Sequence, residues 1–251
     1  MILVLIVAFS CGIMGPHSGQ DLASGIPYQD RSAEIANLLA PQTTNGKEVW
    51  SYAPGPATLE EVRPKLIQIA NQSPGSRKSV IDALIRVLND PKEEFDMAVY
   101  RWRFAAALLG ELKATEAIDD LIRNITWTSY HGWPRIYPVR AALIKIGEPA
   151  IPRLLVALSD SNEMRRWEAS EALGEIGGPC VDGLLDVLAR AGPHARSWAA
   201  HALALVGNAR GREAIELALS VETDAEAKKH LEYAISHMDH VECLRDSSKC
   251  K

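Results

Sequence analysis

Apolar residues recur at helical spacing through most of the chain. From about residue 57 to residue 238 they follow an i, i+3, i+4 pattern, which places them on one face of a helix. Residues 58–61 (TLEE) form a capping box, a common helix start. No stretch beyond this point alternates apolar and polar residues as a half-buried strand does. The pattern therefore predicts an all-α fold.

A short phrase repeats four times in this helical region. The four copies are LLGELK (108–113), ALIKIG (142–147), ALGEIG (172–177) and ALALVG (202–207). They end at positions 113, 147, 177 and 207, in steps of 34, 30 and 30 residues, and such fixed-period similarity is typical of repeat proteins. Glycine ends three copies, where it supplies the left-handed conformation that commonly terminates a helix. Each phrase therefore marks the end of a first helix.

A second amphipathic helix follows each phrase. Its apolar residues read AIxxLI (117–122), AIxxLL (150–155), CVxxLL (180–185) and AIxLxL (214–219), and we expect each group to share one face. Residues 80–88 indicate the second helix of an earlier pair, and Thr223 with Glu226 caps a final helix that ends at about His237. The sequence therefore predicts five helix pairs and a C-terminal helix.

Residues 171–179 (EALGEIGGP), preceded by Arg166 and Ala169, resemble the short HEAT-like repeat of the phycobilisome-lyase type. The resemblance covers residues 57–238 and is strongest in the third to fifth repeats. It implies a right-handed α-α superhelix, a HEAT or armadillo-like solenoid, whose second helices line the concave side. Solenoids offer extended surfaces to partners because each repeat contacts only its neighbours.

Arginines near the starts of first helices suggest links between repeats. We expect Asp160 to pair with Arg165 or Arg166, and Arg196 to take the same place in the next unit. A structural role is favoured because these positions recur with the repeat. An anion-binding stripe is the alternative.

The N-terminal residues predict an export leader followed by a linker. Residues 1–10 (MILVLIVAFS) are apolar but too short to span a bilayer, so residues 1–15 are interpreted as a signal peptide or lipoprotein leader, although no Lys or Arg precedes the apolar run. In the lipoprotein reading Cys11 is lipidated and tethers the protein to a membrane. A mis-set start codon is the alternative. Residues 16–56 form a Pro/Gly-rich linker with one short helix near residues 31–39. We therefore expect a periplasmic, membrane-anchored or secreted protein.

An aromatic insertion, residues 125–138 (ITWTSYHGWPRIYP), breaks the repeat period. Insertions in repeat proteins often lie on the binding face, and Trp and Tyr are frequent anchors of interfaces. The candidate partner-binding residues are Trp127, Tyr130, His131, Trp133, Arg135 and Tyr137. The alternative is that these rings fill a seam between repeats. The second-helix face is the next candidate contact surface.

The C-terminal tail, residues 239–251, carries two cysteines close together. Cys243 and Cys250 are candidates for a disulfide in an oxidising compartment, whereas Cys180 falls in a helical pattern as a small core residue. His237, His240 and Cys243 are weak candidates for a metal site, because their spacing drifts around a helix. We therefore predict neither a metal nor another cofactor.

Composition and motifs narrow the function to binding. The chain has 251 residues, 47% of them hydrophobic and 24% charged, as in ordinary globular proteins. Its net charge of −5 argues against a nucleic-acid-binding solenoid, and no known catalytic motif is found. The sequence therefore predicts an exported, non-enzymatic scaffold that binds a protein partner. A phycobilin-lyase-like enzyme or chaperone is the alternative.

Overall fold

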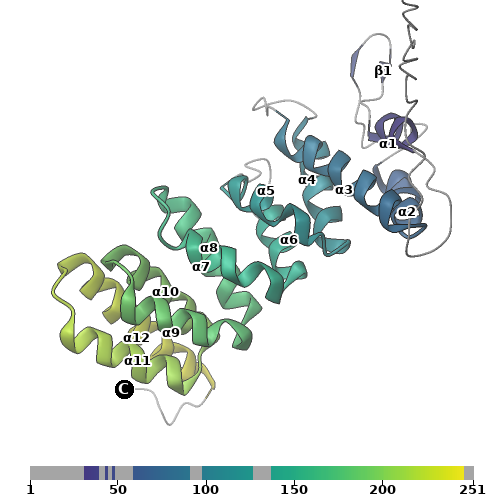
Figure 1. Cartoon of the computed structure of the whole chain (residues 1–251). Helices are drawn as coiled ribbons and strands as arrows, with labels where there is room; N and C mark the ends of the chain where they lie inside the picture. Colours follow the sequence, from purple (N-terminus) through teal and green to yellow (C-terminus); the bar gives the residue numbers. More distant parts are fainter. Residues whose placement is uncertain are drawn as a thin grey trace, which may run out of the picture.

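A computed structural model describes residues 31–39, 43–44, 47–48, 59–90, 98–126 and 137–245 of the chain. In Figure 1 the helices succeed one another along one direction, from the purple α1 at the upper right to the yellow-green helices at the lower left. This row of stacked helices is the all-α superhelix that the repeats predict. No helix among the described residues is long and apolar enough to cross a membrane.

The helices form five consecutive pairs and a final single helix within the described ranges. The pairs are α2 (Leu59–Ala70) with α3 (Pro74–Asn89), α4 (Ala98–Glu111) with α5 (Ile118–Arg123), α6 (Pro138–Ile146) with α7 (Ile151–Ala157), α8 (Glu163–Ile176) with α9 (Val181–Arg190), and α10 (Pro193–Val206) with α11 (Ala209–Val221). The last helix, α12, spans Ala225–Arg245 and so continues past the end expected at about His237.

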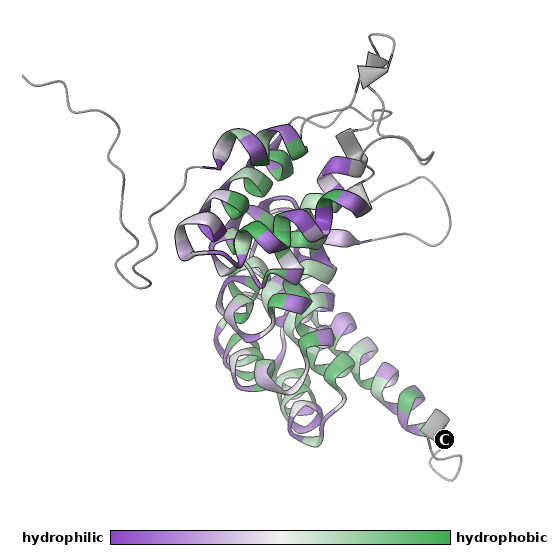
Figure 2. Ribbon diagram, turned by 90° about the vertical axis from the view of Figure 1, so that its right-hand side faces the viewer, coloured by the Kyte–Doolittle hydropathy of each residue, from purple (hydrophilic) through white to green (hydrophobic). Residues whose placement is uncertain are grey.

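Smaller elements complete the structure. A short helix, α1 (Ser32–Leu39), contacts α3 and buries Ile35. Two short strands, β1 (Thr43–Thr44) and β2 (Lys47–Glu48), pair antiparallel. Single 3-10 turns, Thr115–Ala117, Glu148–Ala150 and Gly178–Cys180, lead directly into α5, α7 and α9. Along the helices, hydrophobic and hydrophilic residues alternate in patches, as amphipathic helices require (Figure 2).

The helices lie in two layers with one continuous core between them. The first helices α4, α6, α8, α10 and α12 each contact the next, and the second helices α5, α7, α9 and α11 do the same. The first helices contribute a fully buried leucine at the same place in every phrase: Leu109, Leu143, Leu173 and Leu203. The second helices contribute four fully buried side chains to the same core: Leu121, Leu154, Leu184 and Ile215. The repeat is therefore a ladder of apolar side chains.

Glycines of the repeated phrase have two different roles. Gly207 ends α10 with φ 68° and ψ 36°, the predicted left-handed conformation. Gly147 and Gly177 end α6 and α8 with φ of 78° and 83° but ψ of −136°, so their positive φ needs glycine although their conformation is not the left-handed one. Gly110 instead lies where α4 touches α6, since a Cβ there would come within 2.6 Å of the Ala142 Cα atom. Gly174 meets Leu205 of α10 in the same way.

The arginines link helix starts to the preceding turns. Arg165 pairs with Asp160 at 2.8 Å, and Arg166 donates to the Asp160 carbonyl oxygen at 2.8 Å. Arg196 donates to the Ala191 carbonyl oxygen at 2.7 Å. These contacts lie within and between neighbouring repeats, as the structural reading of the sequence expects.

The expected face of the fourth second helix is wrong at one residue. Residues 214–219 were expected to place Leu217 with Ile215 on a buried face, but Ile215 is fully buried whereas Leu217 is 69% exposed. Two residues along a helix turn by about 200°, so these side chains point to opposite sides. The helix also begins earlier, at Ala209, and its other buried residue is Gly211.

We predict that Gly110→Ala destabilises the protein by about 2 kcal/mol or more, because the added methyl group meets backbone atoms of α6. Gly178→Ala is the matched control, since nothing lies within 4 Å of its Cβ position, and we expect it to be neutral or slightly stabilising. Denaturant unfolding of both variants measures the difference. Equal stabilities would contradict the close approach of α4 and α6.

Candidate interaction surfaces

Most of the predicted partner-binding residues lie outside the described residues. This applies to Trp127, Tyr130, His131, Trp133 and Arg135, for which the sequence-based proposal stands untested. Tyr137 is described and lies at the start of α6. The centre of its ring lies 6.1 Å from that of Trp167 on α8, in an edge-to-face arrangement. The Arg140 guanidinium lies over the Tyr137 ring, 4.2 Å from its centre. Tyr137 therefore packs against a seam between repeats.

Arg140 holds three carboxylates of the next first helix. Its guanidinium lies 3.3 Å from Glu168 and 3.5 Å from both Glu171 and Glu175. These glutamates follow one another at i, i+3 and i+7, which places them on the same face of α8. One guanidinium shared at such long distances compensates three carboxylates only in part.

Glu168 is the most constrained member of this cluster. Its side chain is fully buried, and its Oε1 atom has no hydrogen-bond partner. Burial raises the pKa of Glu168 to about 7; Arg140 opposes this shift, and the neighbouring Glu171 and Glu175 add to it. The carboxyl group therefore changes its charge near neutral pH inside the contact between α6 and α8.

A row of rings continues from this cluster along the first helices. His201 of α10 hydrogen-bonds Glu171 at 2.9 Å, and this bond is the main reason that the pKa of Glu171 is lowered. Trp198 lies 5.8 Å from the His201 ring and 6.0 Å from that of His230 on α12. We call Tyr137, Arg140, Trp167, Glu168, Glu171, Glu175, Trp198, His201 and His230 the first-helix strip. Sequence reasoning missed it, although His201 follows Glu171 by one repeat period.

The second-helix layer carries a different surface, an apolar groove between α9 and α11. The groove has a volume of about 460 Å³ and is lined by Leu185, Leu188, Ala189, Arg196, Ala214, Leu217, Ala218, Val221, Glu222 and Thr223. Leu217 and Val221 stand one helical turn apart and are 69% and 72% exposed. We call this the α9–α11 groove.

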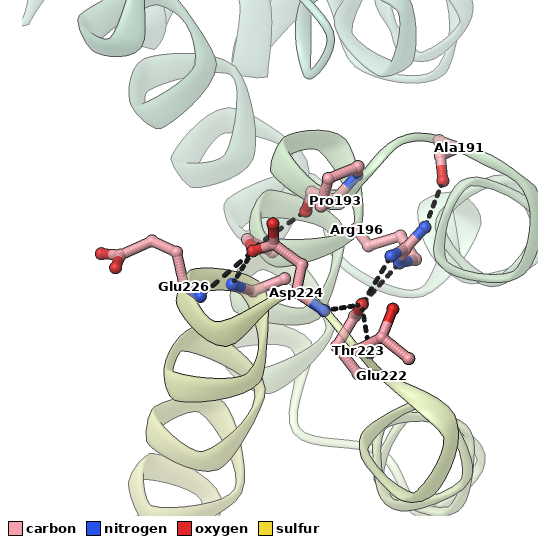
Figure 3. A network of polar contacts seen from close by, with 9 residues as sticks. Ala191, Pro193, Arg196, Glu222, Thr223, Asp224 and Glu226 are labelled. Atoms are coloured by element: carbon pink, nitrogen blue, oxygen red, sulfur yellow. Dashed lines mark hydrogen bonds and ion pairs between the residues drawn. The ribbon is translucent and has the colours of Figure 1, made fainter.

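The charged groups of the α9–α11 groove are paired within the protein (Figure 3). Arg196 makes two hydrogen bonds of 2.8 Å to the Glu222 carboxylate. Glu222 also accepts from the backbone N–H groups of Thr223 at 2.9 Å and Asp224 at 3.0 Å. The Asp224 hydrogen bond is the leading cause of the lowered pKa of Glu222. The groove therefore offers apolar surface without an uncompensated charge.

The cysteines and histidines near the C-terminus do not form a metal site in the described part of the chain. No group of three His, Cys, Asp or Glu residues there is arranged to hold a metal ion, and Cys243 is disulfide-bonded, which removes its thiolate from a set with His237 and His240. Its expected partner Cys250 lies outside the described residues, as does Cys11, so that pairing stays a prediction. Cys180 is a free, buried thiol whose pKa is raised to about 11 by burial.

We predict that Glu168→Gln stabilises the protein above neutral pH. Folded Glu168 keeps its proton up to about pH 7, whereas the unfolded chain releases it near 4.5, so the wild-type protein loses stability as the pH rises between these values. A neutral glutamine avoids that loss, which amounts to at most about 3 kcal/mol.

Urea unfolding at pH 5 and pH 8 measures this effect. The stability gain of Glu168→Gln should be clear at pH 8 and small at pH 5. Glu213→Gln, at an exposed position of α11, serves as the control and should show no such pH dependence. A variant that is less stable than wild type at pH 8 would show that the charged carboxylate stabilises the Arg140 cluster.

Comparison with known proteins agrees with the repeat architecture. The family model for HEAT repeats matches residues 151–236, which include α7 to α11 and half of α12. No protein of curated function matches the sequence.

Several solved structures are similar at low identity. A designed armadillo repeat protein in complex with the peptide (KR)4 is 18% identical, with 84% of this chain and 100% of that chain covered and a TM-score of 0.32. The complex of CpcE and CpcF of phycocyanin lyase from a Nostoc species is 22% identical over 82% of this chain and 83% of that chain, with a TM-score of 0.32. A chain from a study of microtubule plus-end tracking by XMAP215, CLIP-170 and EB1 is 13% identical, covers 82% and 89%, and has a TM-score of 0.44. The family model thus identifies HEAT repeats in residues 151–236, and the helix pairs and the recurring phrase extend the same repeat architecture over the other described repeats.

Proposed function

We propose that this protein is a non-enzymatic scaffold that binds a protein partner through the α9–α11 groove. The observation that supports this proposal is the exposure of Leu217 and Val221 beside an apolar hollow. Single exposed apolar residues are common on protein surfaces. Two of them on one helical ridge, next to a groove with paired charges, are better explained by an interface.

Covering this surface would contribute favourable free energy to binding. Burial of an exposed leucine or valine side chain contributes about 1.5–3 kcal/mol. Leu217 and Val221 together therefore supply about 3–6 kcal/mol before the costs of association, and the other apolar residues of the groove add to this. The groove matches the second-helix face that the sequence indicates as a contact surface. The insertion residues, Trp133 among them, remain a second proposed contact.

We predict that Leu217→Asp weakens partner binding at least about tenfold without lowering stability, because the side chain is exposed in the free protein. Tyr233→Asp is the matched control, since Tyr233 is a large exposed residue, 62% accessible, on α12. Quantitative affinity capture from native fractions compares the partners held by both variants with those of the wild type.

The two variants separate the two candidate surfaces. Loss of a wild-type partner in Leu217→Asp alone supports the α9–α11 groove. Loss in Tyr233→Asp alone would place the interface on the first-helix layer and would contradict the proposal.

We further propose that the protein works outside the cytoplasm. The apolar residues 1–10 support export, and so does the disulfide of Cys243, because such bonds persist mainly in oxidising compartments. A lipid on Cys11 would in addition tether the protein to a membrane.

Intact-mass analysis of membrane and soluble fractions from the native host tests this part. Export predicts a chain that lacks the first ten or so residues, and lipidation predicts a heavier form that begins at Cys11 in the membrane fraction. Reduction should add two hydrogen atoms per disulfide. A full-length, fully reduced chain in the cytoplasm would contradict export.

A further inference from the structure

The second helices of the last three complete repeats can be compared residue by residue. Leu154 of α7, Leu184 of α9 and Ile215 of α11 are each fully buried, and they align these helices with one another. They follow one another in steps of 30 and 31 residues. With this alignment, Leu155 in α7 corresponds to Leu185 in α9, and Gly183 in α9 corresponds to Ala214 in α11.

The seam between α7 and α9 is closed by one leucine. A Cβ atom on Gly183 would lie only 2.4 Å from the Cδ1 atom of Leu155. Leu155 therefore packs directly against Gly183, and a methyl group on residue 183 would require the end of this leucine side chain to move.

The equivalent seam between α9 and α11 stays open. Ala214 carries the methyl group that Gly183 lacks, so a leucine placed there as Leu155 is placed in the preceding repeat would have to shift its side chain. Leu185 and Ala214 both line the α9–α11 groove instead. The groove is thus a repeat seam whose equivalent leucine, Leu185, lines the open space.

The size of the groove indicates how many side chains fit. A cavity of roughly 150 Å³ accommodates a benzene-sized group. The groove, at about 460 Å³, therefore accepts two or three leucine-sized side chains. Because Arg196 and Glu222 satisfy each other, a charged group would gain no partner there.

The backbone of the occupant must satisfy its own hydrogen bonds. The walls are the helices α9 and α11, and helix interiors have no free N–H or C=O groups to pair with an extended peptide. A helical segment already pairs its backbone N–H and C=O groups internally. Along α11 the lining runs from Ala214 to Val221, about 10 Å at 1.5 Å per residue, which matches apolar residues at i, i+3 or i+4, and i+7 of a second helix.

We infer that the α9–α11 groove receives an amphipathic helix of a partner protein, whose leucine-sized side chains fill the open seam as Leu155 fills the seam between α7 and α9. This inference rests on the proposed function and names the kind of segment that binds. An extended peptide or a second copy of this chain in the groove would be a different outcome.

Methyl NMR of the full folded chain tests the inference with a defined probe. The probe is a synthetic amphipathic peptide of about 15 residues, helical in solution, with leucines at i, i+4 and i+7. We expect saturable shifts of the Leu185, Leu188 and Leu217 methyl signals. A matched peptide with serine at the three leucine positions should give none. Absence of shifts with the leucine peptide, or equal shifts with both peptides, overturns the inference.

Two variants test where and why the peptide binds. Ala189→Leu places a leucine from the protein itself in the groove and should weaken binding about tenfold, whereas Ala141→Leu, at an exposed position of α6, should leave it unchanged. Ala214→Gly removes the methyl group that keeps Leu185 out and should also weaken binding. Undiminished binding by both groove variants contradicts the seam account.

Failure of this inference is distinguishable from failure of the proposed function. A partner that depends on Leu217, found without any binding of the leucine peptide, leaves the proposed function intact and rejects the helical occupant. If the Leu217→Asp variant binds every partner as strongly as the wild-type protein does, the proposed function itself is rejected.

Discussion

Close packing between neighbouring helices sets the geometry of the whole superhelix. At Gly110 and Gly174, α4 meets α6 and α8 meets α10 so closely that one added methyl group would collide with the neighbour. The buried leucines of the phrase, Leu109, Leu143, Leu173 and Leu203, lie in the core at the same place of each first helix. The positions of the second helices depend on the layer of first helices, because only a few residues connect each second helix to its first helix.

Close packing also explains how the surface of the second-helix layer can differ from one repeat to the next. Where glycine allows it, as at Gly183, a leucine of the preceding helix closes the seam. Where Ala214 stands, the helices keep a groove between them. On this account, the open groove depends on the residues at one seam of the repeat array. The first-helix strip shows the opposite case, since its carboxylates and rings are largely used in contacts between repeats.

The sequence predicted the architecture because the repeats impose it many times over. The phrase, its terminal glycines and the i, i+3, i+4 spacing indicate five pairs and a last helix. The sequence did not reveal the groove. The apolar pattern of residues 214–219 places Leu217 on a buried face, but Leu217 lies about 200° around α11 from the buried Ile215 and is exposed. Burial of Glu168 was also beyond the sequence, since it depends on how closely α6 approaches α8.

The central claim is that the α9–α11 seam is open and apolar whereas the α7–α9 seam is filled. A crystal structure of the protein under xenon pressure tests this claim most directly, because xenon occupies unfilled apolar space. We predict xenon between Leu185 and Ala214, and none between Leu155 and Gly183. Xenon at the Leu155 seam, or an α9–α11 groove closed by Leu185, would contradict it.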